Sequence, residues 1–186
     1  LQLNDWSGAW NAFQRAIELK PGDEDLYVYF AQACIHREDF DGAAVALRKA
    51  IDIAPTQIQA RLLYAQLLQR SGDFKHAIEL TRQTLEYAPN EAAVHLEMAT
   101  ILWKQGNHDL ALHHYQTAHQ LEPSTARIGH AYAHALTVIG RYRDAVEVFR
   151  SVLGNQGLTV TIIRDALAVF LVLGMTDECE RVIDEA

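Results

Sequence analysis

The sequence predicts an all-α solenoid built from antiparallel helix hairpins. The chain has 186 residues, and its four prolines, at positions 21, 55, 89 and 123, are each 34 residues apart. A fixed period of this length is typical of repeat architectures, in which every repeat is one supersecondary unit. Two further residue types keep the same period: alanine at Ala9, Ala43, Ala77 and Ala111, and glycine at Gly72, Gly106, Gly140 and Gly174.

Each recurring residue type has a physical reason for its position. Small side chains suit the sites where two helices cross closely. Glycine suits a helix end at which the backbone adopts a positive φ and turns back. Proline ends the second helix of each hairpin, because it lacks the amide hydrogen that would continue the hydrogen-bond ladder.

The periodic positions predict where the helices lie. We expect a lone helix near 6–19, first helices near 24–37, 58–71, 92–105, 126–139 and 160–173, and second helices near 40–53, 74–87, 108–121, 142–153 and 176–185. A polar residue shortly after each proline is expected to be the N-cap of the next helix, because its side chain can accept a hydrogen bond from the first turn. These residues are Asp23, Thr56, Asn90 and Ser124.

The pattern resembles the tetratricopeptide repeat (TPR), a helix–turn–helix unit of 34 residues. The resemblance covers the whole chain and implies one array: a half repeat at 1–23, repeats at 24–57, 58–91, 92–125 and 126–159, and a partial, divergent repeat at 160–186. It also implies a right-handed superhelix whose concave face is lined by the first helices. Because the chain starts at Leu1, we interpret it as a piece of a larger TPR protein.

Several positions depart from the family pattern. Glu38 stands where the turn glycine is expected, and Gly157 stands where a fifth proline is expected. The family's aromatic residue in the first helix is present as Tyr27 only, and the next three repeats have Arg61, His95 and Gly129. The last repeat is the least regular, with Leu167 where a small residue is expected.

The resemblance implies a partner-binding surface on the first helices. Six positions of each repeat form one stripe by helical geometry, and this stripe holds amides, aromatic residues and scattered charges. Such a composition suits a peptide or a partner helix, with Tyr29 and Trp103 as anchors; the alternative is that Trp103 packs between helices. The candidate binding residues are Tyr29, Gln32, His36, Leu63, Gln66, Gln69, Arg70, Glu97, Thr100, Trp103, Lys104, His130 and His134.

Two peptide-binding devices known in the family are absent from this stripe. The carboxylate clamp of chaperone-tail binders needs lysine at repeat position 5, which here holds Val28, Leu62, Leu96 and His130. The asparagine ladder of glycosyltransferase arrays occupies position 6, which here holds Tyr29, Leu63, Glu97 and Ala131. We therefore expect a protein or peptide partner that is held in another way.

The number of histidines suggests that the chain could respond to pH or bind a metal. Eight of the nine lie between residues 58 and 140, beside six Lys or Arg and seven Asp or Glu, so their protonation would make this segment positive and its groove pH-dependent. His130 and His134 are spaced i, i+4, which can hold a divalent metal with help from His113, His114 or His119. A third ligand at a recognisable spacing is lacking, so we expect packed or solvated histidines and no metal.

Composition argues against several other functions. The net charge of −8 disfavours nucleic acid and anionic membrane surfaces as partners. The longest apolar run, 166–173, is too short for membrane insertion. Cys34 and Cys179 fall at core positions of the repeat, which favours buried thiols and a reducing compartment such as the cytoplasm. Catalytic and phosphate-binding motifs are absent, so we expect no enzyme activity and no cofactor.

The lone first helix is expected to expose an apolar face with Trp6, Trp10 and Phe13, through which the chain could self-associate. The function that fits these observations is a protein-interaction scaffold that binds a peptide or partner protein in its concave groove. The alternative is the substrate-selecting arm of a larger enzyme, such as a glycosyltransferase or a sulfotransferase. A metal or pH sensor built on the histidines is the third interpretation.

Overall fold

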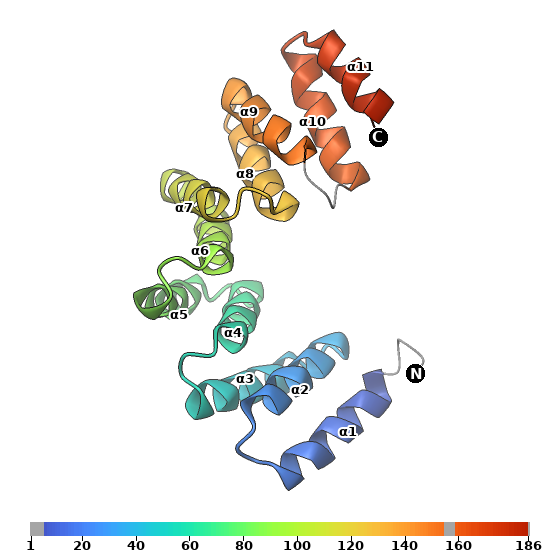
Figure 1. Ribbon diagram of the computed structural model, residues 1–186. Coiled ribbons are helices and arrows are strands. Elements are labelled where there is room, and N and C mark those ends of the chain that lie inside the picture. Colours follow the sequence, from blue (N-terminus) through green and yellow to red (C-terminus); the bar gives the residue numbers. More distant parts are fainter. Residues whose placement is uncertain (1–5, 155–158, 186) are drawn as a thin grey trace. The chain divides into compact units, whose positions relative to one another are not determined.

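A computed structural model describes residues 6–154 and 159–185, and within them it contains helices and no strands (Figure 1). Every predicted helix is present, and no end differs from its predicted position by more than one residue. The prediction of an all-α fold of helix hairpins is confirmed. The helices are α1 (Trp6–Leu19), α2 (Glu24–His36), α3 (Phe40–Ile53), α4 (Ile58–Arg70), α5 (Phe74–Tyr87), α6 (Ala92–Gln105), α7 (His108–Leu121), α8 (Ala126–Val138), α9 (Tyr142–Leu153), α10 (Val160–Val172) and α11 (Thr176–Glu185).

The chain divides into two compact units, Leu1–Pro89 and Asn90–Ala186. In the first unit α1 packs on α2, α2 pairs with α3, α3 packs on α4, and α4 pairs with α5. In the second unit the hairpins are α6–α7, α8–α9 and α10–α11, with α7 packed on α8 and α9 on α10. Each unit is thus a stack of hairpins, and the repeat bounds within one continuous array stay a prediction.

The cores of the four hairpins from α2 to α9 are formed around the periodic small residues. Small side chains allow the two helices to approach closely, so a larger residue at these positions would force them apart. Thr84 takes the place of an alanine on α5, and its Oγ1 donates to the Leu80 carbonyl at 2.8 Å, which satisfies the buried hydroxyl. The buried alanines are Ala31, Ala65, Ala99 and Ala133 on the first helices and Ala43, Ala77, Ala111 and Ala145 on the second.

The turn inside each hairpin needs one residue in the left-handed conformation. The four glycines predicted for this site have positive φ: 81° at Gly72, 89° at Gly106, 79° at Gly140 and 71° at Gly174. Glu38 occupies the same site of the first hairpin with φ of 62°, although its Cβ makes this conformation costly. The glycine prediction is confirmed, and the turn geometry is kept where glycine is missing.

The predicted N-caps are wrong in three of four repeats. Asp23 is at the cap position of α2, although its side chain accepts no hydrogen bond from the first turn. The other first helices begin one residue later than a cap at Thr56, Asn90 or Ser124 requires. The reason is that each proline and the residue after it form a turn. The observed caps are Gln57, Glu91 and Thr125.

The second proline turn shows how such a cap forms. The Gln57 amide donates to the Ala54 carbonyl at 3.0 Å and closes the turn. The Gln57 side-chain oxygen then accepts from the Ala60 amide at 2.7 Å, which satisfies one free donor of the first turn of α4.

A side chain on the first helix fastens the proline turn that precedes it in two repeats. The Tyr27 hydroxyl donates to the Pro21 carbonyl at 3.2 Å. Arg61, one period later, uses its Nε to donate to the Pro55 carbonyl at 2.5 Å, and its guanidinium lies 5.3 Å from the centre of the Tyr87 ring. Arginine in place of the family's aromatic residue therefore still makes the same contact with the turn.

Gly129, at the equivalent position of α8, is explained by its neighbours. A Cβ built there would lie 2.3 Å from Cγ2 of Val152 on α9 and 3.4 Å from the His119 ring of α7. The first distance is far below van der Waals contact and the second is at its lower limit, so these two side chains already fill the space that an aromatic residue would need. Gly157, where a fifth proline was expected, lies outside the described residues.

Candidate functional site

The predicted binding stripe is most accessible in the first unit, on α2 and α4. Tyr29 has 51% of its surface exposed, and its ring stacks on Phe13 of α1 with a centroid distance of 5.9 Å and an interplanar angle of 19°. The Arg70 guanidinium lies 4.2 Å from the centre of the Phe40 ring. His36 and Gln66 are also exposed, Gln32 and Leu63 are partly buried, and Gln69 is buried.

In the second unit the same stripe is more involved in internal contacts. The Trp103 ring stacks on His108 at 4.3 Å and meets the edge of Tyr115 at 6.3 Å, both on α7. It is therefore part of the packing of its own hairpin, with a partly exposed surface. Lys104 is exposed, Glu97 is buried, and the Thr100 hydroxyl donates to the carbonyl of Leu96 at 2.9 Å.

His130 and His134 do not face each other as metal ligands. His130 Nε2 lies 3.0 Å from Oδ2 of Asp165 on α10, whereas the His134 side chain is exposed and its ring centre lies 6.2 Å from that of His130. Burial alone would raise the pKa of Asp165, but hydrogen bonds from His130 and Arg164 outweigh it and lower the pKa. The ionised carboxylate can only accept, so His130 donates and ties α8 to α10.

A histidine contact that the sequence analysis missed joins α6 and α7. His95 Nδ1 and His114 Nδ1 lie 3.0 Å apart, and the His113 ring centre is 5.8 Å from that of His114. Burial, reinforced by His95 and His113, lowers the pKa of His114 to about 4, and burial also lowers the pKa of His119. For His114, this low pKa contradicts the expectation that these histidines become charged in mild acid, because burial disfavours the charged form.

Other sequence-based expectations concern metals, membranes and thiols. In the part of the chain that the structure describes, no three His, Cys, Asp or Glu side chains are grouped so that they could hold a metal ion. Among the described helices, none has the length and apolar character needed to cross a bilayer. Cys34 and Cys179 are both buried, as predicted from their repeat positions.

The aromatic face of α1 is partly used inside the first unit. Trp10 packs against Phe30 of α2 with a centroid distance of 5.8 Å, and the Arg37 guanidinium lies 4.8 Å from the Trp10 ring centre. Phe13 packs on α2 as well. The face that was expected to be exposed is therefore only partly exposed at Trp10 and Phe13, because α2 covers part of both side chains. The Trp6 side chain lies outside what the structure describes, and self-association stays a prediction.

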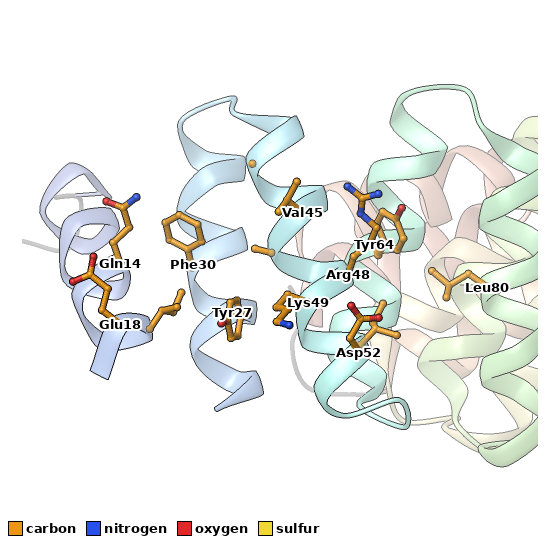
Figure 2. A pocket seen from close by; sticks show the side chains of 14 residues that line it. Gln14, Glu18, Tyr27, Phe30, Val45, Arg48, Lys49, Asp52, Tyr64 and Leu80 are labelled. Atoms are coloured by element: carbon orange, nitrogen blue, oxygen red, sulfur yellow. The ribbon is translucent and has the colours of Figure 1, made fainter. Parts of the chain in front are cut away.

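The first unit also contains a pocket of about 900 Å³ that the sequence analysis did not predict. Figure 2 shows α1 side chains on one side of Tyr27 and Phe30 and the charged side chains of α3 on the other, with Tyr64 and Leu80 beyond them. None of the predicted binding residues lines it. The lining residues are Gln14, Ile17, Glu18, Tyr27, Phe30, Gly42, Val45, Ala46, Arg48, Lys49, Ile51, Asp52, Tyr64 and Leu80.

Comparisons with solved structures return TPR proteins of similar fold. PilW, described as a widely conserved type IV pilus biogenesis factor, has a TM-score of 0.81 and 17% identity over 97% of this chain and 84% of its own. TTC0263, a thermophilic TPR protein of Thermus thermophilus, has a TM-score of 0.76 and 18% identity over 91% of this chain and 92% of its own. YrrB, described as a TPR protein with an unusual peptide-binding site, has a TM-score of 0.64 and 19% identity over 95% of this chain and 91% of its own.

The sequence was also compared with family models and with curated proteins. No curated protein matches it significantly. One tetratricopeptide repeat model matches residues 35–101, and a second matches residues 1–58 and 96–157. The second model alone spans more than half of the 186 residues. With the period, the hairpins and the turn glycines in agreement, the chain belongs to the tetratricopeptide repeat family.

Proposed function

We propose that this chain is a non-catalytic scaffold that holds a partner protein or peptide on the first helices of its repeats. The observation that carries the proposal is the exposed part of the stripe in the first unit. There a half-exposed aromatic residue, Tyr29, shares α2 with Gln32 and His36, while the neighbouring hairpin offers Gln66 and Arg70 on α4. Aromatic and arginine side chains supply most of the binding energy at protein interfaces.

Two of these side chains are held in place before a partner arrives. Stacking on Phe13 restricts the Tyr29 ring, and the contact with Phe40 restricts the Arg70 guanidinium. A side chain that is already ordered loses less conformational entropy on binding. The amides of Gln32 and Gln66 can pair with the backbone of a bound peptide, whose donors and acceptors need partners.

The net charge of the chain supports a protein partner over a nucleic acid, since phosphate binding depends on clusters of Lys and Arg. In the second unit, Trp103, Lys104 and His134 offer a smaller surface of the same kind. The alternative, a substrate-selecting arm of a larger enzyme, would use the same stripe and stays a prediction.

The proposal is tested by affinity capture with matched variants. The double variant Tyr29→Ala, Arg70→Ala removes both ordered side chains, whereas Leu110→Ala removes an exposed apolar side chain of α7, outside the stripe. Proteins from a lysate of the source organism that bind the wild type and the Leu110 variant, but not the double variant, are partners of the stripe.

The strongest partner is then purified and titrated by calorimetry. We expect the double variant to lose at least about tenfold in affinity, as hot-spot truncations do. If the double variant retains the same proteins with the same affinity as Leu110→Ala, the stripe is not the binding surface.

A further inference from the structure

The pocket of the first unit lies on a part of the surface that the proposed scaffold function does not use. Tyr27 and Phe30 form its floor on α2, whereas the stripe on the same helix uses Tyr29, Gln32 and His36. The volume of about 900 Å³ lies at the upper end of the range for ligand sites. The pocket is therefore a second candidate binding site within one unit.

Three helices form the main walls and floor of the pocket, and Tyr64 of α4 and Leu80 of α5 lie beyond α3. Helices α1 and α3 both pack on α2, so the α2 side chains lie at the bottom of the space between them. On α3 the lining includes Gly42 and Ala46, and these small side chains leave the floor accessible. The result is a groove between two helices, and an additional amphipathic helix can bind in a groove of this kind.

The lining combines an apolar floor with an apolar rim. Ile17, Phe30 and Ile51 are partly buried around the floor. Val45, on the rim of α3, is 59% exposed and has no place in the core of the unit. An exposed valine beside a partly buried apolar floor indicates a surface that gains free energy when a partner covers it.

The charges along the two walls differ in sign. Arg48 and Lys49 project from α3, and among the described residues neither forms an ion pair. Glu18 stands on the α1 wall, also without an ion pair there. Asp52 follows Arg48 by one turn of α3, so the positive segment of this wall is short.

We propose that this pocket receives the apolar face of an amphipathic helix from a partner protein, with carboxylates along the edge that meets Arg48 and Lys49. The opposite edge of the bound helix faces Glu18 and suits a basic or neutral side chain. Asp52 repels a long acidic edge, so the carboxylates are confined to about one turn. The occupant is a helix rather than a small apolar molecule because charged side chains of opposite sign lie on the two walls, where they can pair with the two edges of one helix.

The probe is a fluorescein-labelled synthetic helix of about 14 residues with leucines on one face. One version carries glutamates on one edge and lysines on the other, and a second version carries lysines on both edges. Fluorescence anisotropy measures the affinity of the protein for each peptide. We expect the first peptide to bind at least about tenfold more tightly than the second, because only it can pair with Arg48 and Lys49.

Two protein variants test the location of this binding. Val45→Asp places a charge on the apolar rim, and Val138→Asp makes the same change at a valine of α8 that is 58% exposed and lies outside the pocket. Both residues are exposed, so both variants are expected to fold, as thermal unfolding monitored by circular dichroism will show. Val45→Asp should weaken binding of the first peptide by about tenfold or more, and Val138→Asp should leave it unchanged.

The charge assignment has its own test. Arg48→Glu with Lys49→Glu should reverse the preference, so that the peptide with lysines on both edges binds more tightly. The proposal is overturned if Val45→Asp and Val138→Asp bind alike, or if the charge reversal leaves the preference unchanged. It is also overturned if neither peptide binds while the dye ANS binds in a manner that Val45→Asp abolishes, since the pocket is then a site for small apolar molecules. Tyr29 and Arg70 do not line the pocket, and Val45, Arg48 and Lys49 do not belong to the stripe, so failure of one proposal is distinguishable from failure of the other.

Discussion

His95 on α6 and His114 on α7 meet through their Nδ1 atoms, 3.0 Å apart, so that the two rings share one hydrogen bond at most. The contact requires at least one neutral ring, because two protonated rings would present only donors. Burial, with His95 and His113 nearby, lowers the pKa of His114 to about 4, below its usual value of 6.5. A base whose pKa is lowered by folding stabilises the fold fully above pH 6.5, and this contribution is lost as the pH falls from 6.5 towards 4.

We therefore expect the wild type to lose about 1 kcal/mol of unfolding free energy between pH 7 and pH 5 through this site, after allowance for the partial exposure of the ring. His114→Gln removes the titrating group and should show a smaller loss over the same range. Urea unfolding at both pH values measures the difference. NMR titration of the His114 ring gives its pKa directly, and a value near 6.5 would contradict the prediction.

The left-handed turn residue of the first hairpin predicts a stabilising substitution. Glu38 has a φ of 62°, at which its Cβ is unfavourable, so Glu38→Gly should raise the unfolding free energy by about 0.5 kcal/mol after the entropic cost of glycine. Gly106→Ala, at a φ of 89°, is the matched opposite change and should lower it by about 1 kcal/mol. Thermal unfolding of the two variants measures both effects. If both substitutions shifted the unfolding temperature in the same direction, the backbone φ would not be what determines stability at these two turns.

Gly129 predicts a steric coupling between α8 and α9. A methyl group at this position would lie 2.3 Å from Cγ2 of the buried Val152. Gly129→Ala should therefore destabilise the protein by about 1 kcal/mol, because overpacking outweighs the gain in helix propensity. Val152→Ala opens the space, and a double-mutant cycle by urea unfolding should show that Gly129→Ala costs less in that background. Additive effects would mean that Val152 is not the obstacle.

The two cysteines predict low reactivity in the native state. Cys34 is fully buried, and burial, with a contribution from Asp39, raises the pKa of its thiol. Since the thiolate is the reactive species, Cys34 should not react with Ellman's reagent at pH 8 until the protein unfolds. The variant Cys179→Ala isolates the Cys34 signal, and Cys34→Ala isolates that of Cys179. Rapid reaction of Cys34 in the folded protein would show that its hairpin opens on the timescale of the assay.

The helix positions could be predicted from the sequence because proline and glycine act locally. A proline ends α3 and α5 through its own backbone chemistry, whatever the tertiary contacts are. Gly72 and Gly106 allow a backbone conformation that few other residues adopt. The caps were misplaced by one residue because the turn after the proline depends on a backbone hydrogen bond, such as that from Gln57 to Ala54, which composition does not reveal.

The contacts between helices could be predicted less well. His95 and His114 are 19 residues apart on partner helices, and their meeting depends on how α6 and α7 are rotated. The contact between His130 and Asp165 could have been predicted from the sequence, because their separation of 35 residues is one repeat plus one residue. The pocket could not be predicted because its depth depends on how α1, α2 and α3 pack, which the repeat pattern does not reveal.

The contacts of Tyr27 with Pro21 and of Arg61 with Pro55 bear on how this chain could be engineered. Replacing each residue by the one most frequent at its repeat position is a common route to more stable repeat proteins. Here that approach would put an aromatic residue at Arg61, breaking its contacts with the Pro55 carbonyl and the Tyr87 ring, and at Gly129, where Val152 leaves no room. One repeat position thus holds residues that are not interchangeable, and a consensus version should leave them unchanged.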